Sequence, residues 1–266
     1  DKSQYKIMLR MGIAEQDVEK FIDAKFWGQF FPEFAKKTLD KFGIAYDESR
    51  SFITTDANIM GENIPISEVE DYIFGMVLLN DWSARDIQKW EYVPLGPFLA
   101  KNFASSISPW IVTMDALEPF RTKGPKQVPT PFPYLQQKGK HSYDINLEVA
   151  IQPENSEPTV VSKTNFKYLY WTMNQQLAHH TSNGCRVNSG DMMGSGTISG
   201  PTEDSFGSML ELTWGGKNPI KMADGTERKF INDNDTVIMK GFCQNGQLRI
   251  GFGEVSSKLL PPFVRK

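Results

Sequence analysis

An alternating stretch from Tyr143 to Gln152 constrains the fold more than any other part of the chain. Apolar side chains occupy nearly every odd position and polar side chains the even ones, and this period of two predicts a half-buried β-strand. Further on, Asp224-Gly225 and Asn245-Gly246 favour type I′ turns and predict two β-hairpins. We therefore expect residues 58–266 to form a mainly β fold with some α-helix, a sandwich or roll rather than a βαβ fold.

Helical patterns are confined to a few segments. The charged, amphipathic stretches 15–24 and 32–42 predict that residues 1–57 form a short helical segment, which is too small to be an autonomous domain. Phe166–Asn183 carries an apolar stripe and precedes Gly184, so we expect a long helix that stops there. Ser67 has the spacing of a capping box and predicts a shorter helix.

Charge and hydropathy exclude several classes of partner. A formal net charge of -3 offers no basic surface for nucleic acid. No apolar run approaches the roughly 18 residues of a membrane span, and the N-terminus does not read as a signal peptide. The two cysteines, Cys185 and Cys243, lack C-x-x-C spacing, so we expect buried reduced thiols rather than a disulfide or zinc site. These features predict a cytoplasmic protein without nucleic-acid or membrane partners.

The stretch Asn80–Lys101 gathers chemically active side chains directly after an apolar run. That run, Ile73–Leu79, has the length and composition of a buried strand. A carboxylate at the end of a buried strand, here Asp81, followed by cations and amides is suited to holding a metal ion and a charged intermediate. Polar groups enclosed by apolar sequence usually have partners or a task.

A short helix capped by Ser83 would bring part of this stretch together. Three of its side chains fall at positions i, i+3 and i+7 on one face: Arg85, Gln88 and Tyr92. Asp81 lies four residues before this face begins, and Lys101 returns after a Pro-Leu-Gly-Pro turn. We expect these side chains to converge; the alternative from spacing alone is a solvated helix face with an Asp–Arg pair.

Two later residues are further candidates. Thr197 lies in a glycine-serine loop that can approach a ligand and offer backbone N–H groups, although an ordinary flexible loop is the alternative. Glu211 lies in the middle of an expected strand, Ser208–Trp214, where a solvated strand face is the alternative. We expect structural or capping roles for His179 and His180, which fall near the end of the expected long helix. His141 lies in a polar turn, and nothing local marks it as catalytic.

Together these segments resemble the fumarylacetoacetase family. The resemblance runs from about residue 58 to residue 266 and includes the motifs PLGPFLAKNF, YDINLEV, SGTISG and SFGSMLEL. It implies a mixed β-sandwich roll of the family's C-terminal catalytic type, usually dimeric. It also implies a hydrolase that cleaves fumarylacetoacetate, a 1,3-dicarbonyl acid, to fumarate and acetoacetate in tyrosine and phenylalanine degradation. The expected cofactor is Mg²⁺ or Ca²⁺.

The resemblance implies a role for each candidate residue. Asp81 matches a carboxylate ligand of the metal, with Lys101 and Ser105 at positions near that metal. Substrate binding is implied for four residues: Arg85, Gln88, Tyr92 and Thr197. Catalysis is implied for Glu211, which matches the acid that polarises a histidine, and for three residues that stabilise developing negative charge: Arg85, Gln88 and Lys101.

The chain departs from the family pattern upstream of Asp81. The family supplies its other metal carboxylates, including a Glu-x-Glu pair, and its catalytic histidine from that upstream part. Asp47 and Ser49 stand where the pair is expected, and no histidine precedes His141. We therefore expect Asp81 to be the one strong ligand and Glu211 to lack its histidine. A catalytically dead fold remnant that acts at most as an interaction partner is the alternative to a working hydrolase.

Residues 1–56 resemble a different family. The motif FPEFA and the run from Lys41 to Asp56 are similar to an internal fragment of eukaryotic cytosolic leucyl-tRNA synthetase. The ATP-binding signatures of that family are absent, so the resemblance implies no aminoacylation. It implies a chimeric chain whose two parts join near Asp56–Met60.

Overall fold

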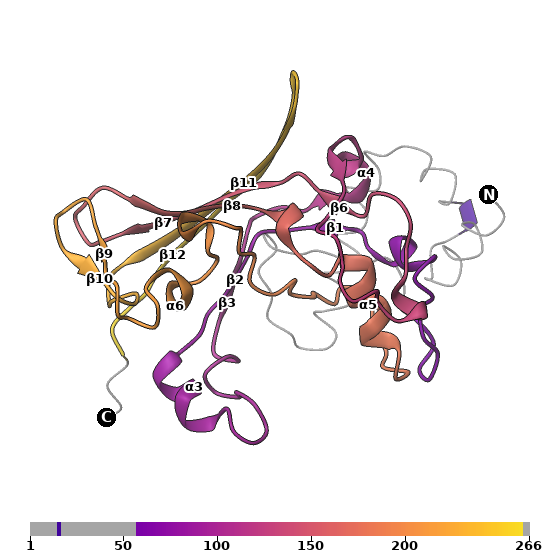
Figure 1. The fold of residues 1–266 in the computed structure, drawn as a ribbon, viewed down its shortest axis with the longest axis horizontal. Coiled ribbons are helices and arrows are strands. Elements are labelled where there is room, and N and C mark those ends of the chain that lie inside the picture. The colour runs from indigo at the N-terminus through magenta and orange to yellow at the C-terminus, as the bar shows by residue number, and fades with distance from the viewer. Residues whose placement is uncertain (1–14, 17–56, 263–266) are drawn as a thin grey trace. The chain divides into compact units, whose positions relative to one another are not determined.

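The structure, a computed structural model, describes residues 15–16 and 57–262. The chain divides into two units after Ser51, and every element named below belongs to the second unit (Figure 1). Apart from residues 15, 16 and 57, the helices expected in residues 1–57 and the synthetase resemblance of residues 1–56 lie outside the described residues, and both stay predictions.

Short strands and short helices alternate along the described chain. The strands are β1 (Gly75–Met76), β2 (Leu79–Asp81), β3 (Ser105–Ile107), β4 (Val112–Thr113), β5 (Arg121–Thr122), β6 (Ser142–Tyr143), β7 (Asn146–Gln152), β8 (Thr159–Asn165), β9 (Ile220–Lys221), β10 (Glu227–Arg228), β11 (Thr236–Asn245) and β12 (Leu248–Lys258). The α-helices are α3 (Arg85–Glu91), α4 (Met114–Leu117), α5 (Met173–Thr181) and α6 (Met209–Leu212). The 3-10 helices are η3 (Val69–Tyr72), η4 (Glu118–Phe120), η5 (Pro133–Leu135), η6 (Phe166–Tyr168) and η7 (Glu203–Ser205).

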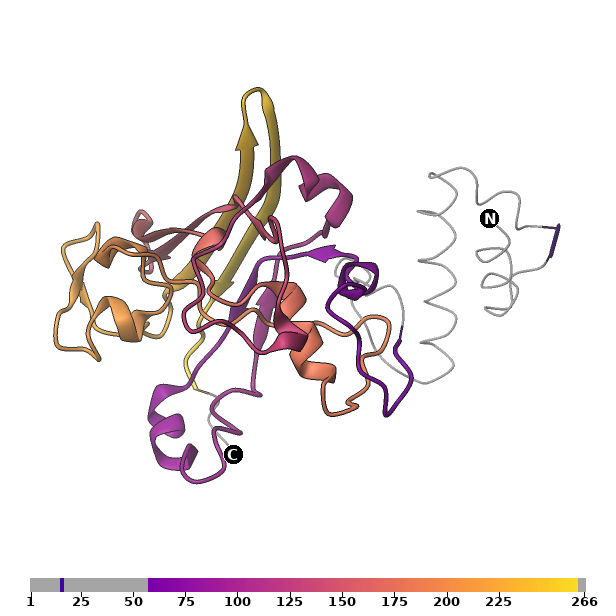
Figure 2. The ribbon, with the colours of Figure 1, turned by 45° about the vertical axis from the view of Figure 1, so that its right-hand side comes forward.

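A four-stranded sheet ordered β12-β11-β7-β8 is the largest sheet among the described residues. Its strands pair antiparallel, and β11 follows β7 from Thr236 opposite Gln152 to Phe242 opposite Asn146. The hairpin of β11 and β12 extends beyond the other strands, while α3 stands apart from the sheet at the ends of β2 and β3 (Figures 1 and 2). The expected mainly β fold with some helix is confirmed.

The alternating stretch is divided rather than continuous. Asp144 separates β6 from β7 because its N–H donates to the carbonyl of Phe120 at 2.8 Å, outside any strand ladder. Ile145, the next residue, is 2% exposed and belongs to a core cluster with Tyr143 and Phe252. The prediction of a half-buried strand is confirmed for β7, and the single strand from Tyr143 to Gln152 is wrong.

Both expected hairpins form, but neither uses the expected turn. A type I′ turn needs positive φ at both central residues, and of each dipeptide only the glycine has it: Gly225 at +82° and Gly246 at +59°. In the first hairpin the N–H of Gly225 donates to the carbonyl of Met222 at 3.0 Å, so the turn begins one residue earlier than expected. The hairpins are confirmed and the turn type is wrong.

The apolar run Ile73–Leu79 forms two short strands instead of one. β1 pairs with β4, whereas β2 pairs with β3. Between them the N–H of Leu78 donates to the hydroxyl of Ser108 at 3.0 Å, which interrupts the ladder. Met76 and Leu78 are buried while their neighbours are only partly buried. A fully buried continuous strand is therefore wrong, and alternate side chains enter the core.

The helix expected over Phe166–Asn183 is also divided. η6 is capped by the side chain of Asn165, and α5 starts afresh at a capping box in which Thr172 and Gln175 bond each other's backbone. Gly184, with φ of +82°, ends the segment as expected. α5 is the longest described helix at nine residues, and none of the described helices is long and apolar enough to cross a membrane.

Glu70 ties η3 to three other segments. Its carboxylate accepts hydrogen bonds from Arg121 at 2.9 Å and from Asn174 at 2.9 Å, and it lies 3.3 Å from Nδ1 of His141. η3 begins after Glu68 without a side-chain cap, so the capping role predicted for Ser67 is wrong. His141 is therefore part of a network of contacts around Glu70.

We expect the contribution of Glu70 to stability to depend on pH. Partial burial raises the pKa of Glu70, but hydrogen bonds from Arg121 and Asn174 and the charge of Arg121 lower it from the usual 4.5 to about 2. A lowered folded-state pKa stabilises the fold above the unfolded value, and this stabilisation is lost as pH falls through the folded value. Glu70→Gln should therefore destabilise the protein at neutral pH and progressively less below about pH 4.5. Urea unfolding of the wild type and the variant at neutral pH and near pH 2, the folded-state pKa, checks this. The same difference in stability at both pH values would contradict it.

A buried ion pair joins β10 to the start of β11. The guanidinium of Arg228 donates from Nε to Asp235 Oδ2 at 2.7 Å and from Nη2 to Oδ1 at 2.9 Å. The two side chains are only 10% and 1% exposed. The N–H of Asn232 also donates to Asp235 at 2.9 Å. The hydrogen bond from Arg228 to Asp235 raises the pKa of Arg228, so its guanidinium stays charged.

The two cysteines lie in different environments. Both are free thiols, Cys185 exposed and Cys243 buried. Burial, with a smaller effect from the charge of Asp144, raises the pKa of Cys243 to about 12. The expectation of unpaired thiols is confirmed, and the expectation that both are buried is wrong for Cys185.

Candidate functional site

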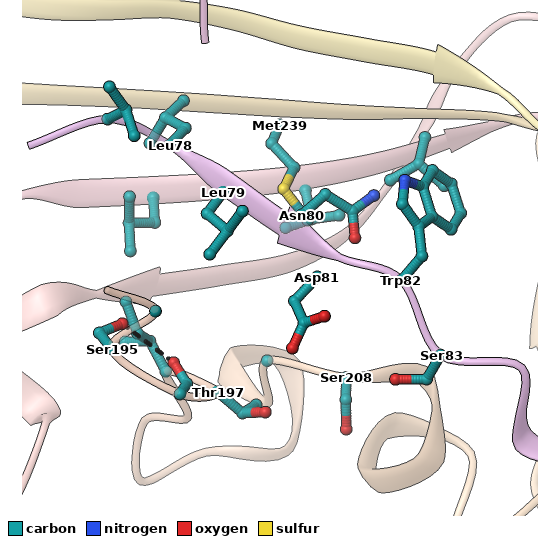
Figure 3. A pocket seen from close by; sticks show the side chains of 18 of the residues that line it. Leu78, Leu79, Asn80, Asp81, Trp82, Ser83, Ser195, Thr197, Ser208 and Met239 are labelled. Atoms are coloured by element: carbon teal, nitrogen blue, oxygen red, sulfur yellow. Dashed lines mark hydrogen bonds between the residues drawn. The ribbon is translucent and has the colours of Figure 1, made fainter. Parts of the chain in front are cut away.

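A cavity of about 1000 Å³ lies where β2 ends and α3 begins (Figure 3). Its lining includes apolar side chains of the four-stranded sheet, among them Leu147, Val149 and Met239. The polar residues of that lining include Asp81, Ser83, Arg85, Gln88, Lys101 and Thr197. Five of the eight candidates proposed from sequence are therefore brought to one cavity, and Ser83 joins them.

Asp81, at the end of β2, forms the centre of the polar group. Its carboxylate extends from the strand towards the loop that carries Ser195 and Thr197 (Figure 3). Nζ of Lys101 lies 2.9 Å from Asp81 Oδ2 and donates to Ser83 Oγ at 2.7 Å. The hydroxyl of Ser83 accepts a hydrogen bond from Lys101, and α3 begins after Ala84 without a side-chain cap. The predicted capping role of Ser83 is therefore wrong.

The face predicted for the first turn of α3 is confirmed in part. Arg85 Nη1 donates to Gln88 Oε1 at 2.9 Å, as the i, i+3 spacing requires. Because the carbonyl oxygen of Gln88 is used in this way, its amide N–H groups remain available to a ligand. Tyr92 is different: α3 ends at Glu91, and Tyr92 follows as a C-cap that is 54% exposed and lines neither cavity described here.

Glu91 shapes the loop that returns the chain to Lys101, a role that sequence reasoning missed. Its carboxylate accepts three backbone N–H groups, from Ala100 at 2.7 Å, Phe98 at 2.8 Å and Leu99 at 3.2 Å. The hydrogen bond from Ala100 is the largest cause that lowers the pKa of Glu91. The sequence does carry a signal for this role. A Pro-Leu-Gly-Pro turn leaves backbone N–H groups without partners, and a carboxylate at the end of the preceding helix can accept them.

Glu211 lies at a second, smaller cavity of about 350 Å³. The strand expected there is wrong, because Ser208 caps α6 by accepting from the N–H of Glu211. The carboxylate of Glu211 accepts from the hydroxyl of Ser199 at 2.8 Å and from that of Ser208 at 2.7 Å. Thr197 lines both cavities, so it connects Glu211 with the Asp81 group.

The described residues do not fit a strong divalent-metal site. Hard cations such as Mg²⁺ and Ca²⁺ need several oxygen ligands, yet no group of three or more His, Cys, Asp or Glu residues within 57–262 can hold a metal ion. Asp81 Oδ2 is engaged by Lys101. Ser105 is the residue opposite Asp81 in β3, but it is exposed and does not line the cavity. The chain's histidines line neither cavity: His141, His179 and His180.

Comparisons with known proteins point to one group of enzymes. The family model described as fumarylacetoacetate (FAA) hydrolase C-terminal matches residues 57–259. The chain is similar to the fumarylacetoacetase of Dictyostelium discoideum, with 58% identity over 82% of this chain and 52% of that protein. The human fumarylacetoacetase is 55% identical over 80% of this chain and 51% of its own length. The Arabidopsis thaliana enzyme is 53% identical over 77% and 48%.

These matches cover most of this chain but only about half of each relative. The chain spans about half the length of the curated relatives that it matches. The matched family model begins at residue 57, so it does not bear on the synthetase resemblance of residues 1–56.

Proposed function

The chain belongs to the fumarylacetoacetate hydrolase family, and on that premise we propose that it hydrolyses a C–C bond in a 1,3-dicarbonyl acid. The proposed substrate is fumarylacetoacetate, the substrate named in the relatives it resembles. Water adds to the fumaroyl carbonyl carbon, and the bond from that carbon to the neighbouring methylene breaks. The electron pair stays on the methylene carbon, which takes up a proton, so the products are fumarate and acetoacetate.

The Asp81–Lys101 pair beside Arg85 is the observation that supports this proposal most directly. Both steps place negative charge on oxygen, first on the hydrated carbonyl and then on the departing enolate. Lys101 and Arg85 supply two cations to the same cavity, and the free amide N–H groups of Gln88 add neutral donors. Donors fixed in place before the reaction stabilise such charge without reorganisation. We assign Thr197 and Tyr92 to substrate binding, Tyr92 from the family resemblance alone.

Glu211 is proposed to polarise the group that activates water. Purified chain incubated with fumarylacetoacetate and Mg²⁺ tests the function by loss of substrate absorbance. We expect hydrolysis that Glu211→Gln lowers to a small but measurable residual rate, whereas the exposed control Glu227→Gln leaves the rate unchanged. No hydrolysis by the wild-type chain would instead support a catalytically inactive remnant that acts as an interaction partner, and equal, measurable rates for the wild type and Glu211→Gln would show that Glu211 takes no part.

The metal site that we propose is weaker than the one that the family resemblance implies. We propose Mg²⁺ or Ca²⁺ as the ion, but among the candidate ligands in the described part of the chain only Asp81 is a carboxylate. We therefore expect calorimetry to give a Kd of about 1 mM or weaker for either ion. Asp233→Ala, which removes an exposed carboxylate far along the sequence, is the matched control. Tight binding that Asp81→Ala abolishes and Asp233→Ala preserves would contradict this expectation.

Assembly, location and domain limits complete the proposal. From the family we propose a cytoplasmic homodimer, with residues 58–266 as the C-terminal catalytic domain and residues 1–57 as a segment that does not fold alone. We also propose that residues 1–56 have a separate, synthetase-related origin. Light scattering tests the dimer. Sequenced transcripts across codons 50–65 test the origin, because reads that continue upstream into a Glu-x-Glu strand would contradict a junction near Asp56–Met60.

A further inference from the structure

Two loops pack against each other so closely that each needs a glycine. A Cβ on Gly207 would lie 2.7 Å from Thr197 Cγ2 and 2.9 Å from the carbonyl carbon of Ile198. A Cβ on Gly200 would lie 2.8 Å from Cβ of Ser205. The N–H of Gly200 also donates to the carbonyl of Ser205 at 2.8 Å. Residues 197–200 and 205–208 are therefore held as one unit, which we call the glycine clasp.

The glycine clasp places one serine on each side of Glu211. Ser199, from the first loop, donates to Glu211 Oε1 at 2.8 Å, and its own oxygen accepts the N–H of Gly207 at 3.0 Å. Ser208, from the second loop, donates to Glu211 Oε2 at 2.7 Å. Each carboxylate oxygen thus has one hydroxyl partner, and because the two donors come from different loops the carboxylate cannot rotate without losing one of them.

We propose that Ser199 and Ser208 are positioning residues that fix the carboxylate of Glu211 for catalysis at the smaller cavity, which Thr197 also lines. This inference rests on the proposed function for the catalytic role of Glu211, but the fixed carboxylate is a separate claim. A carboxylate oxygen can accept more than one hydrogen bond, so each oxygen keeps a free position for a group of the reaction. Hydroxyls suit this task because they orient the carboxylate without neutralising its charge.

Kinetics separate positioning from a purely structural role. Ser199→Ala should lower kcat about tenfold with KM little changed, because the loss of one hydrogen bond to a charged group is worth this much. Ser199→Thr keeps the hydroxyl and should restore most of the rate. In the Glu211→Gln background Ser199→Ala should have no further effect, since the two residues act as one unit. Ser142→Ala, in a buried serine of β6 that lines neither cavity, is the control.

A second measurement does not depend on activity. Side-chain scalar couplings of Glu211 in solution report whether one rotamer or several are populated. We expect one rotamer in the wild type and in Ser142→Ala, and averaged values in the Ser199→Ala/Ser208→Ala variant. Gly207→Ala should also average them, while Gly251→Ala should not, because a Cβ at Gly251 meets nothing within 4 Å.

These outcomes distinguish the two claims. If the wild-type chain shows no hydrolysis, the proposed function fails, and the rotamer data alone decide whether the serines fix Glu211. Averaged couplings already present in the wild type would overturn the proposal. So would an additive loss of rate when Ser199→Ala is combined with Glu211→Gln, because Ser199 would then act independently of that carboxylate.

Discussion

Asp235→Ala is expected to lower the free energy of unfolding by about 3–5 kcal/mol, because it leaves a buried guanidinium without its partner. Arg228 donates twice to Asp235 at 2.7 and 2.9 Å, and both side chains are almost wholly enclosed. The variant also removes the acceptor for the N–H of Asn232. Urea unfolding followed by circular dichroism measures the loss.

A control pair and a double variant make this test specific. Glu154→Ala removes a carboxylate paired with Lys258 at 2.7 Å, but those side chains are 49% and 41% exposed, so the expected loss is below about 1 kcal/mol. Replacing both buried partners, as in Arg228→Met/Asp235→Leu, should recover part of the stability, because no unpaired charge then remains. A double variant as unstable as Asp235→Ala would show that lost packing, rather than charge, dominates.

Lys101→Met is expected to reduce hydrolysis by about 10²–10³-fold, the usual cost of removing one fixed donor from developing negative charge. Nζ of Lys101 lies 2.9 Å from the carboxylate of Asp81, 3.3 Å from its backbone carbonyl and 2.7 Å from Ser83 Oγ. The substitution keeps most of the length of the side chain and removes its charge. The measurement is kcat/KM with fumarylacetoacetate, and most of the effect should appear in kcat.

The control for Lys101 is another lysine in an ion pair. Lys163 pairs with Glu148 across β8 and β7 at 3.5 Å and does not line the cavity, so Lys163→Met should leave the rate unchanged. If both variants hydrolyse the substrate as fast as the wild type, Lys101 does not stabilise the reacting oxygen. The Asp81–Lys101 pair would then be a structural contact at the end of β2.

Local patterns predicted the parts of the fold that local forces decide. The alternation of β7 and the glycines of both hairpins follow from backbone geometry within a few residues, and these elements formed. The strand expected around Glu211 failed for a local reason too, because Ser208 is a helix cap and its side chain outweighs the apolar alternation around it. The break at Asp144 depends on Phe120, which no periodicity reveals.

The candidate site also contains residues that local spacing predicts and residues that depend on distant contacts. Arg85 and Gln88 were predictable because a three-residue spacing on a helix fixes their distance. Tyr92 keeps helical φ and ψ as the C-cap, but it is exposed at the end of the helix and does not line the cavity, which spacing alone could not predict. Of the two serine partners of Glu211, Ser208 lies at local capping distance, but Ser199 could not be inferred, since it is twelve residues away and reaches Glu211 only through the close packing permitted by Gly200 and Gly207.

The contrast between the two thiols also makes the chain easy to study by spectroscopy. With Cys185 at the surface and Cys243 enclosed, a maleimide at neutral pH should react at one position without any cysteine substitution, because a thiol must be accessible and deprotonated to react. Cys185 directly follows Gly184, whose N–H donates to Thr181 at the end of α5. A fluorophore placed there would report how that helix end responds when substrate enters the neighbouring cavities.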